Sequence, residues 1–224
     1  MRIALLDCTL RDGGYINKWA FKESHIAKII HALLDSKVEI IECGYLSDKG
    51  LERDSTLFRD IATIDRLLDS IISSNIAEST NPQLLSLDTH THTCSGASGD
   101  SLSTSDSNLP QANCDKPMFV AMINLGDFNL SYLKPAEDSH ITGLRLAFHK
   151  EHISKALAQA KILQDLGYKV FFQPMVTKRY SDIEFLTMLE SLNALRPHAF
   201  YIVDSFGSMT LREFGRYLLL SDSN

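Results

Sequence analysis

A cation and a carboxylate stand side by side near the start of the chain, within Asp7-Cys-Thr-Leu-Arg-Asp-Gly-Gly14. An apolar run precedes this segment, so Arg11 and Asp12 are expected just beyond the end of a buried strand. A guanidinium can stabilise the negative oxygen of an enolate, and a carboxylate can hold a divalent metal that polarises the same carbonyl. The two glycines allow the backbone to approach a ligand closely. A surface ion pair in a tight turn is the alternative interpretation.

Other polar side chains stand on later strands. Glu42 is expected to face the mouth of the fold beside Arg11, and so to orient the guanidinium, if its strand keeps its alternation. Arg145 and His149 are separated by an even number of positions in one predicted strand, so their side chains should point to the same face. A buried arginine usually pairs with a carboxylate. The candidate substrate-binding residues are Arg145, His149, Gln173 and Asp204. An internal hydrogen-bond network is the alternative role for each of them.

Short apolar runs alternate with helical stretches, which predicts right-handed crossovers and a parallel sheet of an α/β fold. Strands are expected at 3–7, 38–43, 118–123, 141–148, 170–176 and 199–203. Gly44 is expected to close the second strand. Ser24 is expected to cap the first long helix and Phe58 to lie in the second. Ser181 and Glu184 form a capping box for a later helix.

One segment breaks this alternation. Residues 86–108 include seven serines and four threonines among 23 residues. Such a composition buries too little apolar surface to offset its ordering entropy, so a disordered insertion over about 73–115 is expected. His90 and His92 in this insertion have a metal-like His-x-His spacing. The insertion connects a helix to the third strand, and in a βα barrel such connections lie on the face opposite the active site. We therefore expect His90 and His92 to be solvated loop histidines.

Composition limits the class of protein. The chain has 224 residues and a formal net charge of −6, which is typical of one globular domain spanning 1–224 and argues against nucleic acid as a partner. A membrane partner is also not expected, because no apolar run approaches the roughly 18 residues that span a bilayer. The four cysteines show no paired spacing, and the start is not typical of a signal peptide. Free thiols and a cytoplasmic location are expected.

The segment from Asp7 to Gly14 resembles the opening of the HMG-CoA-lyase-like metalloenzymes, the DRE-TIM superfamily. Ile41-Glu-Cys-Gly44, Gly143-Leu-Arg-Leu-Ala-Phe-His149 and Tyr201-Ile-Val-Asp-Ser-Phe-Gly-Ser-Met209 resemble strands two, four and six of its aldolase-type branch. That branch includes 4-hydroxy-2-oxovalerate aldolase and the "aldolase catalytic domain" proteins. Apart from the insertion, the resemblance covers essentially the whole chain, and it implies a TIM (β/α)8-barrel fold.

The resemblance implies a metal-dependent aldolase or lyase that breaks or forms a C–C bond beside the carbonyl of a 2-oxo acid. Arg11 would then stabilise the enolate, and Asp12 would bind Mn²⁺ or Mg²⁺. The catalytic histidine of the oxovalerate aldolases corresponds here to Tyr15, a much weaker base near neutral pH, so the substrate or the proton route must differ. An acyl-CoA-dependent Claisen condensation and a non-catalytic truncated barrel are the alternatives.

The remaining metal ligands of that family are a His-x-His pair that ends strand seven, and no such pair occurs after Met209. About six βα units are therefore expected, forming an incomplete barrel with unpaired edges on its first and last strands. Such a chain is expected to form a homo-oligomer, or to need further C-terminal units for stability. It is also expected to bind Mn²⁺ weakly and to turn over nothing alone.

Overall fold

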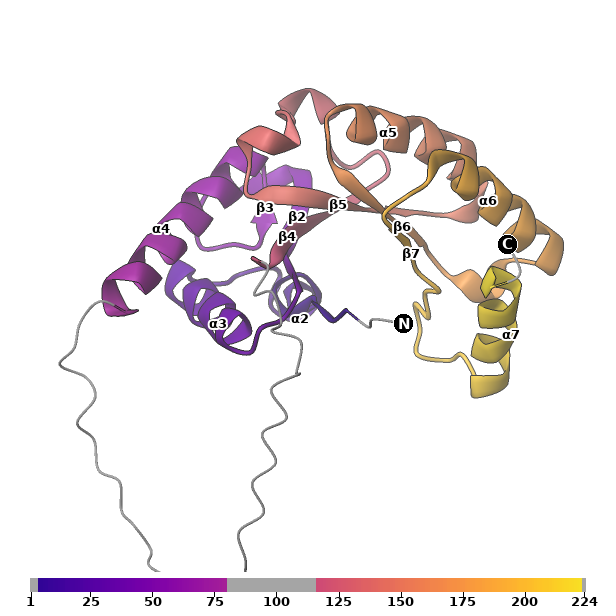
Figure 1. Cartoon of the computed structure of the whole chain (residues 1–224), viewed down its shortest axis with the longest axis horizontal. Helices are drawn as coiled ribbons and strands as arrows, with labels where there is room; N and C mark the ends of the chain where they lie inside the picture. Colours follow the sequence, from indigo (N-terminus) through magenta and orange to yellow (C-terminus); the bar gives the residue numbers. More distant parts are fainter. Residues whose placement is uncertain (1–3, 80–115, 223–224) are drawn as a thin grey trace, which may run out of the picture.

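One curled sheet of parallel strands forms the centre of the molecule, and helices cover its outer face (Figure 1). The structure is a computed structural model that describes residues 4–79 and 116–222. The strands of the main sheet follow the order β1 (Leu6–Asp7), β2 (Ile40–Leu51), β4 (Met118–Asn124), β5 (Ile141–Phe148), β6 (Lys169–Pro174) and β7 (Ala199–Phe200). A short strand, β3 (Leu57–Phe58), pairs with β2 beside this path.

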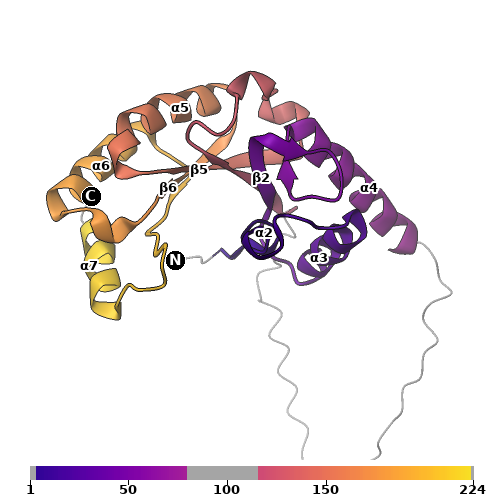
Figure 2. The same ribbon diagram turned by 180° about the vertical axis from the view of Figure 1, so that it is seen from behind.

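The helices form an arc around the sheet that stays open between α2 and α7, as the view from behind also shows (Figure 2). The helices are α1 (Thr9–Asp12), α2 (Gly14–Asn17), α3 (Glu23–Asp35), α4 (Ile61–Ser79), α5 (Ile153–Asp165), α6 (Asp182–Leu195) and α7 (Leu211–Asp222). Single 3₁₀ turns are η2 (Leu130–Tyr132), η3 (Ala136–Asp138), η4 (Lys150–His152) and η5 (Thr177–Arg179). The predicted α/β class with a parallel sheet is confirmed, and its shape is that of an incomplete barrel.

The main apolar core lies between the outer face of the sheet and the helices. Along β5, Leu144, Leu146 and Phe148 are buried in this core, whereas Ala147 belongs to a separate apolar cluster. Successive side chains of a strand point to opposite faces, so Arg145 lies on the same inner face as Ala147. This alternation places polar residues of the sheet on its concave side.

The second strand is longer than predicted, because Gly44 bends it instead of ending it. β2 continues past Gly44 to Leu51, and its register against β4 shifts between Glu42 and Tyr45. Gly44 has a φ of +153°, and a β-carbon there would lie 2.2 Å from the carbonyl oxygen of Thr56. The resulting bulge places Glu42 and Tyr45 on the same inner face, although their spacing is odd.

We expect the variant Gly44→Ala to lower the free energy of unfolding by about 2–4 kcal/mol, because it combines a left-handed φ with a backbone collision. Urea unfolding measures this change. Gly215→Ala is the matched control: Gly215 lies inside α7 with open space around its α-carbon, so alanine should stabilise the helix by about 0.5–1 kcal/mol. Equal stability of Gly44→Ala and the natural chain would contradict the bulge.

Several predicted element boundaries were wrong. Phe58 lies in β3, not in a helix. α4 begins only at Ile61, and the preceding Asp60 accepts a hydrogen bond of 2.7 Å from the amide of Thr63 in its first turn. The N-cap of α3 is Lys22, and Ser24 lies in its first turn. The capping box of α6 is confirmed between Ser181 and Glu184.

α4 continues to Ser79, into the first residues of the insertion predicted at about 73–115. The rest of the insertion, including His90 and His92, lies outside the described residues. Within 4–79 and 116–222, the helices are too short or too polar to cross a bilayer.

Candidate active site

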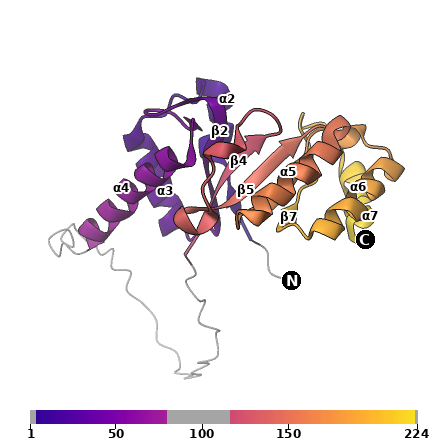
Figure 3. The ribbon, with the colours of Figure 1, turned by 90° about the horizontal axis from the view of Figure 1, so that it is seen from above.

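A cavity of about 500 Å³ lies where the strands of the sheet end. All strands are parallel, so their carboxyl ends meet at one edge of the sheet, where α/β folds bind ligands. The view from above shows β4 and β5 running side by side toward that edge (Figure 3). The cavity is lined by Arg11, Asp12, Tyr15, Tyr45, Met122, Asn124, Ala147, Gln173, Met175, Val203, Asp204 and Ser205.

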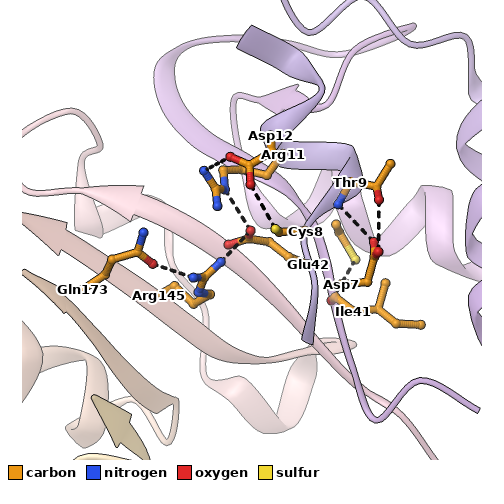
Figure 4. Close-up of polar contacts among 10 residues, drawn as sticks. Asp7, Cys8, Thr9, Arg11, Asp12, Ile41, Glu42, Arg145 and Gln173 are labelled. Carbon is orange, nitrogen blue, oxygen red and sulfur yellow. Dashed lines mark hydrogen bonds and ion pairs between the residues drawn. The ribbon is translucent and has the colours of Figure 1, made fainter. Parts of the chain in front are cut away.

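One buried carboxylate joins two arginines at this site (Figure 4). Oε2 of Glu42 accepts a hydrogen bond of 2.8 Å from Nε of Arg11 and one of 2.7 Å from Nη1 of Arg145. Nη2 of Arg145 donates to Oε1 of Gln173 at 2.5 Å. The predicted neighbours, Glu42 beside Arg11 and a carboxylate beside Arg145, are confirmed. Glu42 is fully buried, however, and not at the mouth as predicted.

Two cations and two carboxylates meet in this cluster, because the half-exposed Asp12 also pairs with Arg11. Arg11, Glu42 and Arg145 are all buried, so two guanidinium groups share one carboxylate away from water. The guanidinium of Arg145 also lies 4.8 Å from the ring centroid of Tyr201, a cation–π contact. Burial lowers the pKa of Arg11, but the charge and hydrogen bond of Glu42 raise it by more, so the group remains a cation.

Asp12 lies at the cavity with about half of its side chain exposed. Its Oδ1 accepts from Nη1 of Arg11 at 2.5 Å, and its Oδ2 accepts from the thiol of Cys8 at 3.0 Å. Burial and then the hydrogen bond to Asp12 raise the pKa of Cys8 to about 11, so Cys8 remains a donor. Cys8 and Cys43 are free thiols, as expected, and the other two cysteines lie outside the described residues.

The described residues do not complete the metal site that the resemblance implies. Mn²⁺ and Mg²⁺ usually take about six oxygen or nitrogen ligands. Among residues 4–79 and 116–222, no group of three or more His, Cys, Asp or Glu side chains is placed to hold a metal. Asp12 is therefore one candidate ligand, with both of its oxygens already hydrogen-bonded within the protein.

Tyr15 lies at the rim of the cavity with 63% of its surface exposed. Its ring meets the indole of Trp19 edge-on at 5.1 Å between centroids. Gly14 allows this arrangement, because a β-carbon there would lie 2.0 Å from Cδ1 of the indole. The aromatic packing thus places the Tyr15 phenol beside the cavity.

Two of the predicted substrate-binding residues, His149 and Asp204, are not free to face a substrate in the predicted way. His149 is exposed and is not among the described residues that line the cavity. β5 ends at Phe148, so strand alternation no longer places His149 on the same face as Arg145. Asp204 does line the cavity, but its two oxygens accept from the amides of Ser208 and Met209 at 3.0 and 2.8 Å. These bonds, that of Met209 first, lower the pKa of Asp204 and keep it ionised.

Sequence reasoning missed a second polar group at the cavity. The hydroxyl of Tyr45 donates to Oδ2 of Asp127 at 3.3 Å, and Nδ2 of Asn124 donates to the same oxygen at 3.1 Å. Because of the bulge at Gly44, simple strand alternation does not predict the face on which Tyr45 lies. The polar turn Asn124-Leu-Gly-Asp127, which follows the third predicted strand, is the sequence signal that could have indicated Asp127.

Comparison with protein-family models finds none that matches this chain, and comparison with curated proteins finds no match. Membership of the HMG-CoA-lyase-like superfamily therefore stays a prediction from the residues quoted above.

Proposed function

We propose that this protein is an aldolase-type carbon–carbon lyase that acts on a 2-oxo acid, and that its sheet is an incomplete TIM (β/α)8 barrel. The observation that carries the proposal is the setting of Arg11. Arg11 lines the cavity, and the fully buried carboxylate of Glu42 accepts a hydrogen bond from its Nε. A cation fixed in this way can stabilise charge that develops on a bound substrate.

Arg11 suits the chemistry of a 2-oxo acid. When the C–C bond beyond C3 breaks, the electron pair moves toward the C2 carbonyl, and its oxygen becomes an enolate oxygen. Arg11 is already oriented by Glu42, so little reorganisation is needed as this charge forms. We also propose Asp12 as one ligand for Mn²⁺ or Mg²⁺.

The alternative Claisen reaction is less well supported by the charges at the cavity. An acyl-CoA carries several phosphate groups, whereas Asp12 and Asp204 place two carboxylates on the cavity wall. Like charges in one site repel, so a polyanionic substrate is disfavoured there. A small 2-oxo acid with one carboxylate brings less negative charge into the site.

The incomplete metal site led to the expectation that this chain alone turns over nothing. Arg11, oriented by Glu42 at the cavity, leads us to propose the opposite outcome. The purified chain should release pyruvate from 4-hydroxy-2-oxopentanoate and from oxaloacetate faster than a protein-free solution does. Both reactions break a C–C bond and leave the same pyruvate enolate for Arg11 to stabilise. A coupled lactate dehydrogenase assay measures pyruvate, with added Mn²⁺ and separately with EDTA. Release of free CoA from acetyl-CoA and a 2-oxo acid would instead favour the Claisen reaction. Absence of turnover in every assay would favour a non-catalytic barrel.

A further inference from the structure

Cleavage of a 4-hydroxy-2-oxo acid requires a group that takes the proton of the C4 hydroxyl. Arg11 cannot do so, because Glu42 keeps it a cation. The phenol of Tyr15 lies at the rim, largely exposed, and no hydrogen bond recorded for the described residues links it to a carboxylate. A second phenol at the cavity does have such a link.

That second phenol is Tyr45, on β2 just after the bulge. Its side chain lines the cavity, yet only 8% of the residue is exposed, so its ring is firmly packed. Met122 and Ala147 form a buried apolar cluster with it on the inner face of the sheet. The hydroxyl leaves this cluster and donates to Oδ2 of Asp127 at 3.3 Å.

Asp127 is held by the loop that follows β4. Nδ2 of Asn124 donates to its Oδ2 at 3.1 Å, its own amide donates to the carbonyl of Asn124 at 3.1 Å, and its carbonyl accepts from the amide of Asp48 at 3.0 Å. Asp127 itself is exposed to solvent. Tyr45 therefore links the cavity to a carboxylate that is exposed to solvent.

We propose that Tyr45 and Asp127 form the proton relay of this site, in which Tyr45 takes the proton of the substrate hydroxyl and Asp127 accepts the proton of Tyr45. This inference rests on the proposed aldolase function. Tyr45 is then the catalytic residue, since its side chain lines the cavity, and Asp127 acts through its hydrogen bond to Tyr45. Asn124 positions Asp127 through their shared hydrogen bond.

The C3–C4 bond breaks, and its electron pair forms the enolate whose C2 oxygen Arg11 stabilises. The O–H pair of the C4 hydroxyl forms the new carbonyl of the aldehyde, while its proton moves to Oη of Tyr45. The proton that Tyr45 carried moves to Oδ2 of Asp127 and from there to solvent. Water returns one proton to C3 of the enolate, which gives pyruvate.

The electrostatic surroundings of Tyr45 support a relay rather than a free phenolate. Burial, followed by the charge of Asp127 and the nearby Tyr15, raises the pKa of Tyr45, and Arg11 opposes this rise in part. Tyr45 therefore keeps its proton in the resting protein. It can accept a second proton only as it passes the first to Asp127.

Two reactions separate the relay from enolate stabilisation. Oxaloacetate loses CO₂ to give the pyruvate enolate without any hydroxyl proton to remove, whereas 4-hydroxy-2-oxopentanoate needs the relay. We expect Tyr45→Phe to lower kcat for the hydroxy acid about 100-fold and to change the oxaloacetate rate less than about three-fold. In Asp127→Asn, the asparagine can still accept the hydrogen bond of Tyr45, but its amide is a poor base. We therefore expect this variant also to lose cleavage of the hydroxy acid while keeping the oxaloacetate rate. KM for the hydroxy acid should change little in both variants.

Tyr132→Phe is the matched control, since Tyr132 is exposed in η2 and is not among the residues that line the candidate site. It should leave both rates unchanged. An equal loss of both reactions in Tyr45→Phe and Asp127→Asn would indicate a structural role and overturn the relay, as would unchanged cleavage in both. If the natural chain turns over neither substrate, the proposed function itself is wrong and the relay falls with it. Asp127→Asn, at an exposed residue, keeps the test decisive if Tyr45→Phe fails to fold.

Discussion

Replacement of Glu42 by glutamine is expected to lower the free energy of unfolding by about 3–5 kcal/mol, the usual cost of breaking a buried ion pair from one side. Glu42 is fully buried, and its Oε2 bonds to both Arg11 and Arg145. Glutamine keeps an acceptor but removes the charge, so two guanidinium groups remain close together without a buried counter-charge. For a domain of this size, the thermal midpoint should fall by roughly 10 °C.

Urea unfolding measures this loss, and Glu190→Gln is the matched control. Glu190 is exposed on α6, so the same substitution there should stay within about 0.5 kcal/mol of the natural chain. Adding Arg145→Met to Glu42→Gln removes one of the two uncompensated cations. The double variant should therefore be more stable than Glu42→Gln alone. A loss below about 1 kcal/mol in Glu42→Gln would contradict the shared role of this carboxylate.

Replacement of Arg11 by lysine is expected to lower kcat about 100- to 1,000-fold for both 4-hydroxy-2-oxopentanoate and oxaloacetate. Lysine keeps the positive charge but loses the planar fork that bonds to Glu42 on one side and faces the cavity on the other. The enolate charge exists only after the C–C bond begins to break. The loss should therefore fall mainly on kcat, with a smaller change in KM.

Steady-state kinetics with both substrates provide the measurement, and Arg212→Lys is the control. Arg212 is exposed in α7, away from the cavity lining, so its replacement should leave both rates unchanged. Glu42 keeps its bond to Arg145 in Arg11→Lys, so the variant should still fold. Full activity of folded Arg11→Lys would remove Arg11 from the reaction.

The selectivity of these losses distinguishes the two roles at the cavity. Arg11→Lys should impair both reactions, because both pass through the same enolate. Tyr45→Phe should impair only the reaction that releases a hydroxyl proton. The two residues lie on different elements, α1 and β2, and the fold brings them to one cavity.

The sequence by itself determined the class of fold and the region of the site. Alternating apolar runs and amphipathic stretches report which backbone segments are buried, and this local information was enough to predict a parallel α/β sheet. The same local chemistry determined the capping box of Ser181 and Glu184. Arg11 and Asp12 were placed at a strand end because a charged pair followed by two glycines comes soon after an apolar run. The prediction that this run is buried was wrong, because β1 is only partly buried and Leu5 is exposed.

Only the tertiary structure decided which of these side chains meet. The bulge at Gly44 changes the parity of β2, and it brings Tyr45 to the inner face where simple alternation does not place it. Tyr45 then bonds to Asp127, which is 82 residues away in the chain. The end of β5 at Phe148 turns His149 out to solvent. Periodicity depends on neighbours in the chain, whereas these contacts depend on strand register and loop paths, which packing across the whole sheet determines.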